Sequence, residues 1–145
     1  MRAFLSLTFL ALVGCDSQSV VSPSSPDINQ SIDSRSVAER LVGVASGTPR
    51  LEFLARAGLT EEAGATMTSY FSTLCGSMEE WTTTNGERYY VQGHFFDSDG
   101  YREEPYIIAA MRFEGESEHP SEVVWSGLNL QTGKDIFAPL AKQEK

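Results

Sequence analysis

The chain has 145 residues, 41% of them apolar and 21% charged, with 20 acidic side chains against 11 basic ones and a formal net charge of −9. This length suits at most one ordinary domain. An acidic chain offers no basic surface for a phosphate backbone, so the composition argues against a nucleic-acid partner.

The first fifteen residues have the layout of a secretory signal. Arg2 precedes an apolar run from Phe4 to Val13, and the run ends at the small residue Gly14. A transmembrane helix needs about 20 apolar residues, and this run has roughly half that number before Asp16. We therefore expect a signal peptide and no membrane span.

Leu12 to Cys15 resembles the lipobox of bacterial lipoprotein precursors, in which a small residue directly precedes the cysteine that becomes the mature N-terminus. The resemblance implies that the Cys15 thiol takes a diacylglycerol thioether, that the signal is cut after Gly14, and that the new α-amine is acylated, with palmitate as an expected acyl group. Each buried methylene contributes ~0.8 kcal/mol, so two or three chains hold a protein firmly on a membrane. The alternative is a conventional signal peptide cut elsewhere, which leaves Cys15 as a free thiol or as a disulfide partner of Cys75.

The residue after the cysteine bears on location. An aspartate at the position of Asp16 resembles the signal that keeps enterobacterial lipoproteins in the inner membrane, so we expect a lipid-anchored protein that faces the periplasm from that membrane, with the outer membrane as the alternative. Seven serines and two prolines between Asp16 and Arg35 predict a flexible linker. The predicted organisation is a signal peptide over 1–14, a lipid-anchored linker over 15–35 and one domain over 36–145.

Three helices are predicted in the first half of the domain. Apolar residues recur at helical spacing over 36–46 and over 49–57, and a glycine follows each segment. The longest pattern follows Thr60 and predicts the main amphipathic helix. Its expected buried stripe is Met67, Tyr70, Phe71, Leu74, Cys75, Met78 and Trp81. The sequence leaves open whether Glu79 to Thr84 ends this helix or pairs across Asn85-Gly86 as a hairpin strand.

From Arg88 onward, aromatic and β-branched residues alternate with polar ones, which predicts strands. The predicted strands are residues 88–96, 106–114 and 123–130 and a short edge strand over 136–138. Helices followed by hairpin-connected strands predict an α+β fold, with two or three N-terminal helices packed on a three- to four-stranded antiparallel sheet. Cys75, on the helical stripe, is expected to be a buried inert thiol, with an intermolecular disulfide as the alternative.

The outer face of this sheet is more aromatic than contact with water requires, which predicts an interaction surface. Its residues are Tyr90, Gln92, His94, Phe96 and Tyr106, with Trp125 extending it. The neighbouring hairpin carries an acidic rim that would dock a basic partner, and its residues are Asp97, Asp99, Glu103 and Glu104. A solvated rim and a weak calcium site at the Asp97 turn are the alternatives.

No nucleophile elbow, phosphate-binding glycine loop, metalloprotease helix or dinucleotide turn is in the sequence. His94 and His119 are the only histidines, and no His/Cys spacing predicts a zinc site. We therefore expect a binding module that is not an enzyme and needs no cofactor or metal. It would be anchored in membrane lipid through Cys15 and would hold a protein partner, as assembly, inhibitor or immunity proteins do. The alternatives are a pocket for a small apolar ligand between helix and sheet and, third, an enzyme.

Overall fold

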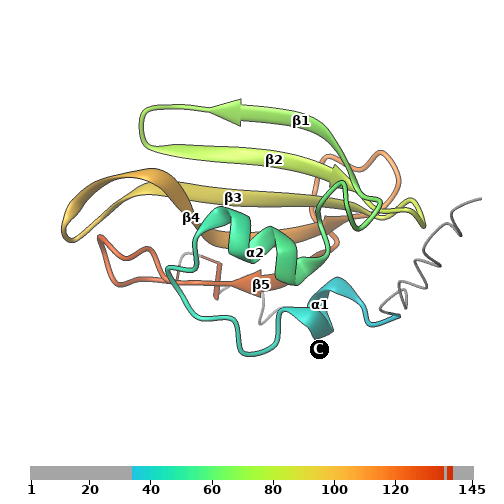
Figure 1. The fold of residues 1–145 in the computed structure, drawn as a ribbon, viewed down its shortest axis with the longest axis horizontal. Coiled ribbons are helices and arrows are strands. Elements are labelled where there is room, and N and C mark those ends of the chain that lie inside the picture. The colour runs from blue at the N-terminus through green and yellow to red at the C-terminus, as the bar shows by residue number, and fades with distance from the viewer. Residues whose placement is uncertain (1–33, 136, 139–145) are drawn as a thin grey trace, which may run out of the picture. The chain divides into compact units, whose positions relative to one another are not determined.

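The structure is a computed structural model that describes residues 34–135, 137 and 138. Two short helices precede a run of strands (Figure 1). In chain order the elements are α1 (Val37–Arg40), α2 (Arg50–Ala57), β1 (Thr66–Ser72), β2 (Gly76–Thr82), β3 (Arg88–Asp97), β4 (Gly100–Phe113) and β5 (Glu122–Ser126).

The strands form one antiparallel sheet in the order β1-β2-β3-β4-β5, so each strand pairs with its neighbours in the chain. The register sets Glu79 beside Val91, Val91 beside Ala110, and Ala110 beside Trp125. Side chains on opposite residues of paired strands share a face, so these four point to one side of the sheet. That side is the one covered by the helices.

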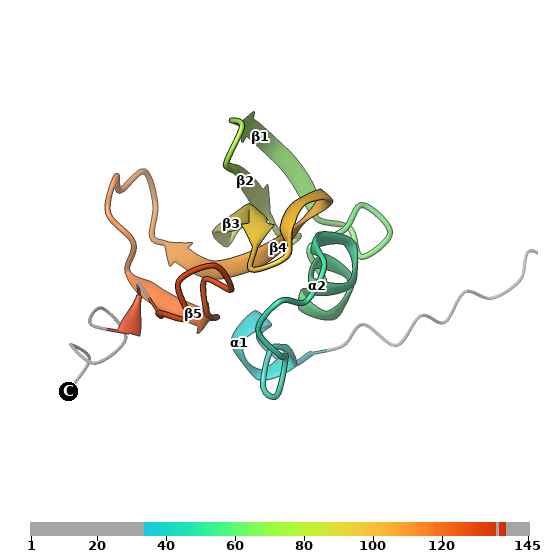
Figure 2. The ribbon, with the colours of Figure 1, turned by 90° about the vertical axis from the view of Figure 1, so that its left-hand side faces the viewer.

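Both helices lie over this one face, α2 against β4 and α1 against β5 (Figures 1 and 2). A capping box starts α1, in which the Ser36 hydroxyl accepts from Glu39 N and the Glu39 carboxylate accepts from Ser36 N at 2.7 Å. α2 follows Pro49 and ends at Gly58, whose φ of 71° lies in the left-handed region that favours glycine. Each helix is thus bounded by local chemistry as well as by packing.

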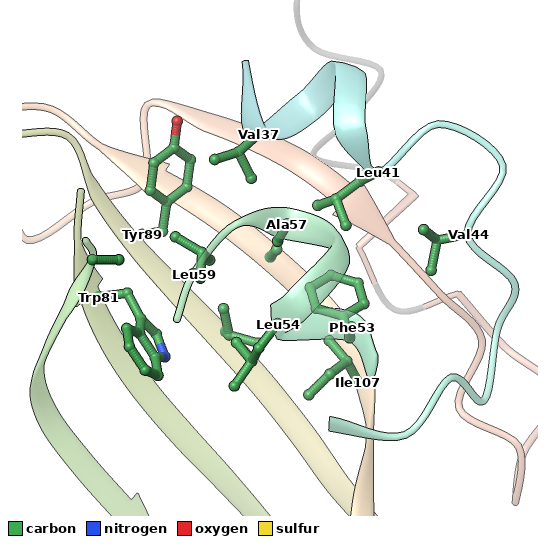
Figure 3. Close-up of a cluster of buried hydrophobic side chains, with 13 residues drawn as sticks. Val37, Leu41, Val44, Phe53, Leu54, Ala57, Leu59, Trp81, Tyr89 and Ile107 are labelled. Atoms are coloured by element: carbon green, nitrogen blue, oxygen red, sulfur yellow. The ribbon is translucent and has the colours of Figure 1, made fainter. Parts of the chain in front are cut away.

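The core lies between the helices and the sheet (Figure 3). Phe53, Leu54 and Ala57 project from α2 onto Val91 and Ile107 of the strands, and full burial of such side chains contributes about 1.5–3 kcal/mol each for the larger ones. The complete buried cluster is Val37, Leu41, Val44, Phe53, Leu54, Ala57, Leu59, Ala65, Trp81, Tyr89, Val91, Ile107 and Ala110.

The predicted fold class is wrong in its central element. The segment expected to form the main amphipathic helix is the β1–β2 hairpin, so the protein is mostly a five-stranded antiparallel sheet with two short helices rather than a helical layer on three or four strands. The apolar residues of this segment do not share one face: Tyr70 pairs with the inward-facing Glu79, Phe71 pairs with Met78 on the opposite side, and Leu74 and Cys75 lie in the turn between the strands. Of the predicted stripe, only Trp81 is buried, because Ser77, Glu79 and Trp81 alternate inward along β2.

Other boundaries also differ from the prediction. The first helix was expected over 36–46, but α1 ends at Arg40, and turns and irregular chain follow. Residues 79–82 are strand, and the chain turns back through Asn85-Gly86, which decides the alternative left open by the sequence in favour of a hairpin. Phe137 and Ala138 do not lie in a strand; their N–H groups donate to the Asp135 carboxylate. The second helix and the strand predicted over 88–96 are found as α2 and β3. The strand predicted over 106–114 begins earlier, at Gly100, and the one predicted over 123–130 ends at Ser126.

Candidate functional site

The face of the sheet opposite the helices is not covered by either of them (Figure 2). We call it the open face and define it by Phe71, Met78, Glu80, Tyr90 and Gln92. The register brings these residues together, since Phe71 pairs with Met78, Met78 with Gln92, and Glu80 with Tyr90. Phe71 is 64% exposed and Met78 is 40% exposed. Large apolar side chains left in solvent at adjoining positions are the kind of patch that marks an interaction site.

Polar contacts fix the surroundings of these apolar groups. Arg88 Nε donates to Glu80 Oε1 at 2.9 Å, and the Tyr90 hydroxyl donates to Glu80 Oε2 at 2.9 Å. The Tyr90 ring also lies against Phe113, with ring centroids 4.4 Å apart. Tyr90 is therefore held in one orientation at both ends of its side chain, which lowers the entropy that a partner would have to remove on binding.

The aromatic residues predicted for this surface divide between surface and interior. Tyr90, Gln92, His94 and Phe96 are half-buried, whereas Tyr106 is fully buried. The Tyr106 hydroxyl donates to Phe96 O at 2.8 Å and accepts from Leu130 N at 3.0 Å. Tyr106 thus joins two segments of the chain and offers no surface to a partner.

Trp125 lies on the helix-covered face and does not extend the open face. It pairs with Ala110, which faces the core, and its ring meets Phe53 edge-on at 4.9 Å between centroids. Its indole N–H donates to Val44 O at 3.3 Å. The prediction that Trp125 would enlarge the aromatic surface is corrected by the β4–β5 register, which a single sequence does not reveal.

The acidic rim is partly used inside the β3–β4 hairpin. Asp97 accepts from Arg102 Nε and from Asp99 N at 2.8 Å. The hydrogen bond from Arg102, together with those from the backbone, holds the pKa of Asp97 below its ordinary value. Glu104 accepts from Leu51 N at 2.8 Å, at the start of α2. Glu103 and Asp99 are exposed and point the remaining negative charge of the rim toward solvent.

A buried ion pair that the sequence did not predict lies under the start of α2. Glu79 is 1% exposed, and Arg50 holds it by two hydrogen bonds, Nε to Oε1 at 2.5 Å and Nη2 to Oε2 at 2.8 Å. Trp81 Nε1 donates to Glu79 Oε2 at 3.1 Å. The hydrogen bond to Glu79 raises the pKa of Arg50. The only sequence signal for an inward-facing Glu79 was the alternation of Ser77, Glu79 and Trp81. This signal was missed because the segment was predicted to be a helix.

The two cysteines have different positions. Cys15, the predicted lipidation residue, lies outside the described residues. Cys75 is exposed in the turn between β1 and β2, and the expectation that it is buried is therefore wrong. In the part of the chain that the structure describes, neither helix is long and apolar enough to cross a bilayer. Within the same residues, no three His, Cys, Asp or Glu side chains converge to hold a metal ion.

The comparisons with known proteins add no relative. A scan against protein-family models, a search of curated proteins and a search of solved structures each found no match to this chain.

Proposed function

We propose that this protein is a lipid-anchored module on the periplasmic face of a bacterial membrane that holds another protein against its open face. The observation that carries the proposal is the exposure of Phe71 and Met78 at adjoining positions on a sheet face that neither helix covers. Burial of such groups is what drives association between proteins, and a partner of matching shape would remove them from water.

The packing between helices and sheet favours a protein partner over a small apolar ligand. Phe53, Ala57, Leu59 and Val91 are all 0% exposed and belong to a single buried cluster. The space in which a ligand was the alternative expectation is thus occupied by the protein's own side chains. The apolar groups that a ligand or partner would reach from solvent are on the opposite side, on the open face.

The charge of the chain indicates which partner would approach. The net charge is −9, and the hairpin next to the open face presents Asp99 and Glu103 to solvent. A basic protein would be steered toward this rim, and salt would weaken that attraction because the Debye length is only ~10 Å at 0.1 M. We therefore place the partner among neutral or basic proteins of the cell envelope.

The anchor is tested at the cysteine. The change Cys15→Ala should prevent lipid addition, because it removes the thiol that follows Gly14 and would carry the lipid. Wild-type protein is expected in the membrane fraction with the mass of an acylated chain, and the Cys15→Ala protein outside it without the added mass. Retention of Cys15→Ala in the membrane fraction at the wild-type level would contradict the anchor. The change Cys75→Ala is the matched control and should leave both mass and location as in the wild type.

The open face is tested by capture from membranes. The full-length protein, tagged at its C-terminus, is isolated from solubilised membranes of the bacterium that makes it, as wild type, as Met78→Lys and as Val42→Lys. Val42 serves as the control. It lies in the turn after α1, on the helix side of the sheet, and its side chain is 79% exposed. We expect one near-stoichiometric partner with wild type and Val42→Lys, and at least about a tenfold loss with Met78→Lys, which corresponds to ~1.4 kcal/mol. Equal capture by the two lysine variants would refute the proposed site.

A further inference from the structure

The two edges of the sheet differ in what lies beside them. Along β5, Trp125 Nε1 donates to Val44 O, and Leu128 N donates to Ser46 Oγ at 3.0 Å, so the chain that follows α1 lies next to this strand. All seven residues of β1 are exposed, and β1 pairs with β2 alone among the described strands (Figure 1). Within the described residues, β1 is therefore the open edge of the sheet.

The hydrogen-bond pattern shows which main-chain groups of β1 face outward. Thr73 N donates to Gly76 O at 2.8 Å, which directs Thr73 toward β2. In an antiparallel pair, successive residues alternate between bonding to the partner strand and pointing away from it. Ser72 and Tyr70 therefore direct their N–H and C=O groups away from the sheet, at the positions where another strand would receive them.

β1 lacks the features that usually prevent edge pairing. Its sequence, Thr-Met-Thr-Ser-Tyr-Phe-Ser, contains no charged residue and no proline. A bulge at Thr68, between Met67 and Ser69, disturbs only its first half. Regular strand remains from Ser69 to Ser72, long enough to present both outward-facing residues.

The carboxylates on the strand next to this edge are already paired. β2 carries two carboxylates. Glu79 is paired with Arg50, and Glu80 Oε1 lies 2.9 Å from Arg88 Nε. An identical strand brought alongside β1 would thus meet hydroxyl and aromatic groups and no unpaired carboxylate of β2. This local neutrality favours a second copy, although the chain as a whole is acidic.

We propose that β1 pairs antiparallel with β1 of a second copy of this chain, with Phe71 opposite Phe71 across a twofold axis. In this register Tyr70 of each copy faces Ser72 of the other, so both outward-facing residues exchange main-chain hydrogen bonds. The register centred on Tyr70 would instead set Ser72 against the bulge at Thr68. Phe71 of each copy gains an aromatic cross-strand neighbour, which replaces the water now around its exposed ring.

The proposed dimer joins two open faces into one surface. Its twofold axis is perpendicular to the sheet, so the faces that carry Met78 in the two copies lie on the same side. The inference goes beyond the function proposed above and does not rest on it: pairing through β1 requires neither the lipid anchor nor a partner protein.

Engineered cysteines test the register. In full-length protein with Cys75→Ser, the change Phe71→Cys places two thiols opposite each other at a Cα separation of ~4.5 Å, within the range of a disulfide. The change Ser69→Cys is the matched control, since it lies on the same exposed strand but its two copies are offset by about 13 Å. We expect a covalent dimer on non-reducing electrophoresis after mild oxidation, formed at least tenfold faster with Phe71→Cys than with Ser69→Cys or with the Cys75→Ser background. Equal rates would overturn the proposal.

Sedimentation of the full chain in density-matched detergent tests the dimer without cysteines. The wild-type protein and the Val42→Lys control should sediment as dimers that dissociate on dilution, and Phe71→Lys should sediment as a monomer, because it places two like charges opposite each other. Higher salt should strengthen the wild-type dimer by screening the net charge of −9. A wild-type monomer at every concentration, or a Phe71→Lys dimer as stable as the wild type, would overturn the proposal. Failure of the partner capture described above would leave these outcomes unchanged.

Discussion

The carboxylate of Glu79 is buried and accepts three hydrogen bonds. Arg50 supplies two of them from the first residue of α2, and Trp81 supplies the third from the same strand as Glu79. A buried ion needs such partners, because desolvation costs several kcal/mol per ion and only well-placed hydrogen bonds offset it. The pair therefore acts as a fixed contact between α2 and β2, and it ties the first residue of the helix to the β1–β2 hairpin.

Removal of the cation should destabilise the protein strongly. Arg50→Ala leaves Glu79 buried without a countercharge, and we expect the free energy of unfolding to fall by about 3 kcal/mol. Arg56→Ala, an exposed change near the end of the same helix, should lower it by less than about 0.5 kcal/mol. Urea unfolding followed by circular dichroism measures both. A similar loss in the two variants would show that the Arg50 contact with Glu79 contributes nothing specific.

The ion pair of Asp97 and Arg102 should be visible in a pH titration. The hydrogen bond from Arg102 lowers the pKa of Asp97, so the folded state binds this proton less readily than the unfolded chain does. The stabilisation is therefore present above the ordinary aspartate value of 3.8 and is lost as pH falls through the lowered pKa. Arg102→Gln should move the midpoint of the Asp97 carboxyl signal in NMR upward, toward 3.8. An unchanged midpoint, equal to that of an Arg56→Gln control, would contradict this assignment.

The β1–β2 hairpin is the element in which the prediction from sequence was wrong. The spacing of Met67, Tyr70, Phe71 and Met78 matches a helix, yet these side chains are exposed on two strands. The composition of the segment indicated a strand instead. Thr, Tyr and Phe are enriched in strands, and Ser disfavours the interior of a helix. The predicted second helix and the strand predicted over 88–96 were confirmed, because a glycine boundary marks the first and strict alternation marks the second.

The binding residues were harder to predict than the strands that carry them. Tyr90 and Gln92 do lie on the open face, as alternation along β3 requires. Tyr106 pairs with the half-buried His94 but is itself fully buried, and Trp125 pairs with Ala110, which faces the core. The β3–β4 register shifts between Gln92 and Gly93, so Ala110 and Tyr106 of the same strand pair with residues on different faces of β3. One extra residue in a strand reverses the faces beyond it, and nothing in a single sequence marks that residue.

The docking of α2 on the sheet depends on Phe53. This ring is fully buried and meets Trp125 edge-on, so Phe53→Ala opens a cavity between the two layers. The expected loss is about 3–5 kcal/mol of unfolding free energy, with a red shift of tryptophan emission as water reaches Trp125. Leu51→Ala, on the solvent side of the same helix, should change neither by much, since Leu51 is 63% exposed. Equal effects of the two changes in thermal unfolding would place the helix contact elsewhere.

The two faces of the sheet differ in how their apolar groups are covered. The helices bury the apolar residues of one sheet face, while the open face and β1 keep Phe71 and Met78 in solvent. In a dimer joined through β1, the two open faces would lie side by side. One target could then contact both of them.

Photocrosslinking in the living cell shows whether the open face holds another protein. A photoreactive phenylalanine analogue placed at Met78 should give one discrete crosslinked product with another protein, distinguishable by its mass from a dimer of this chain, while the same group at Val42 should give none. Absence of any product at Met78, or the same products at both positions, would contradict the claim that the open face holds a protein partner.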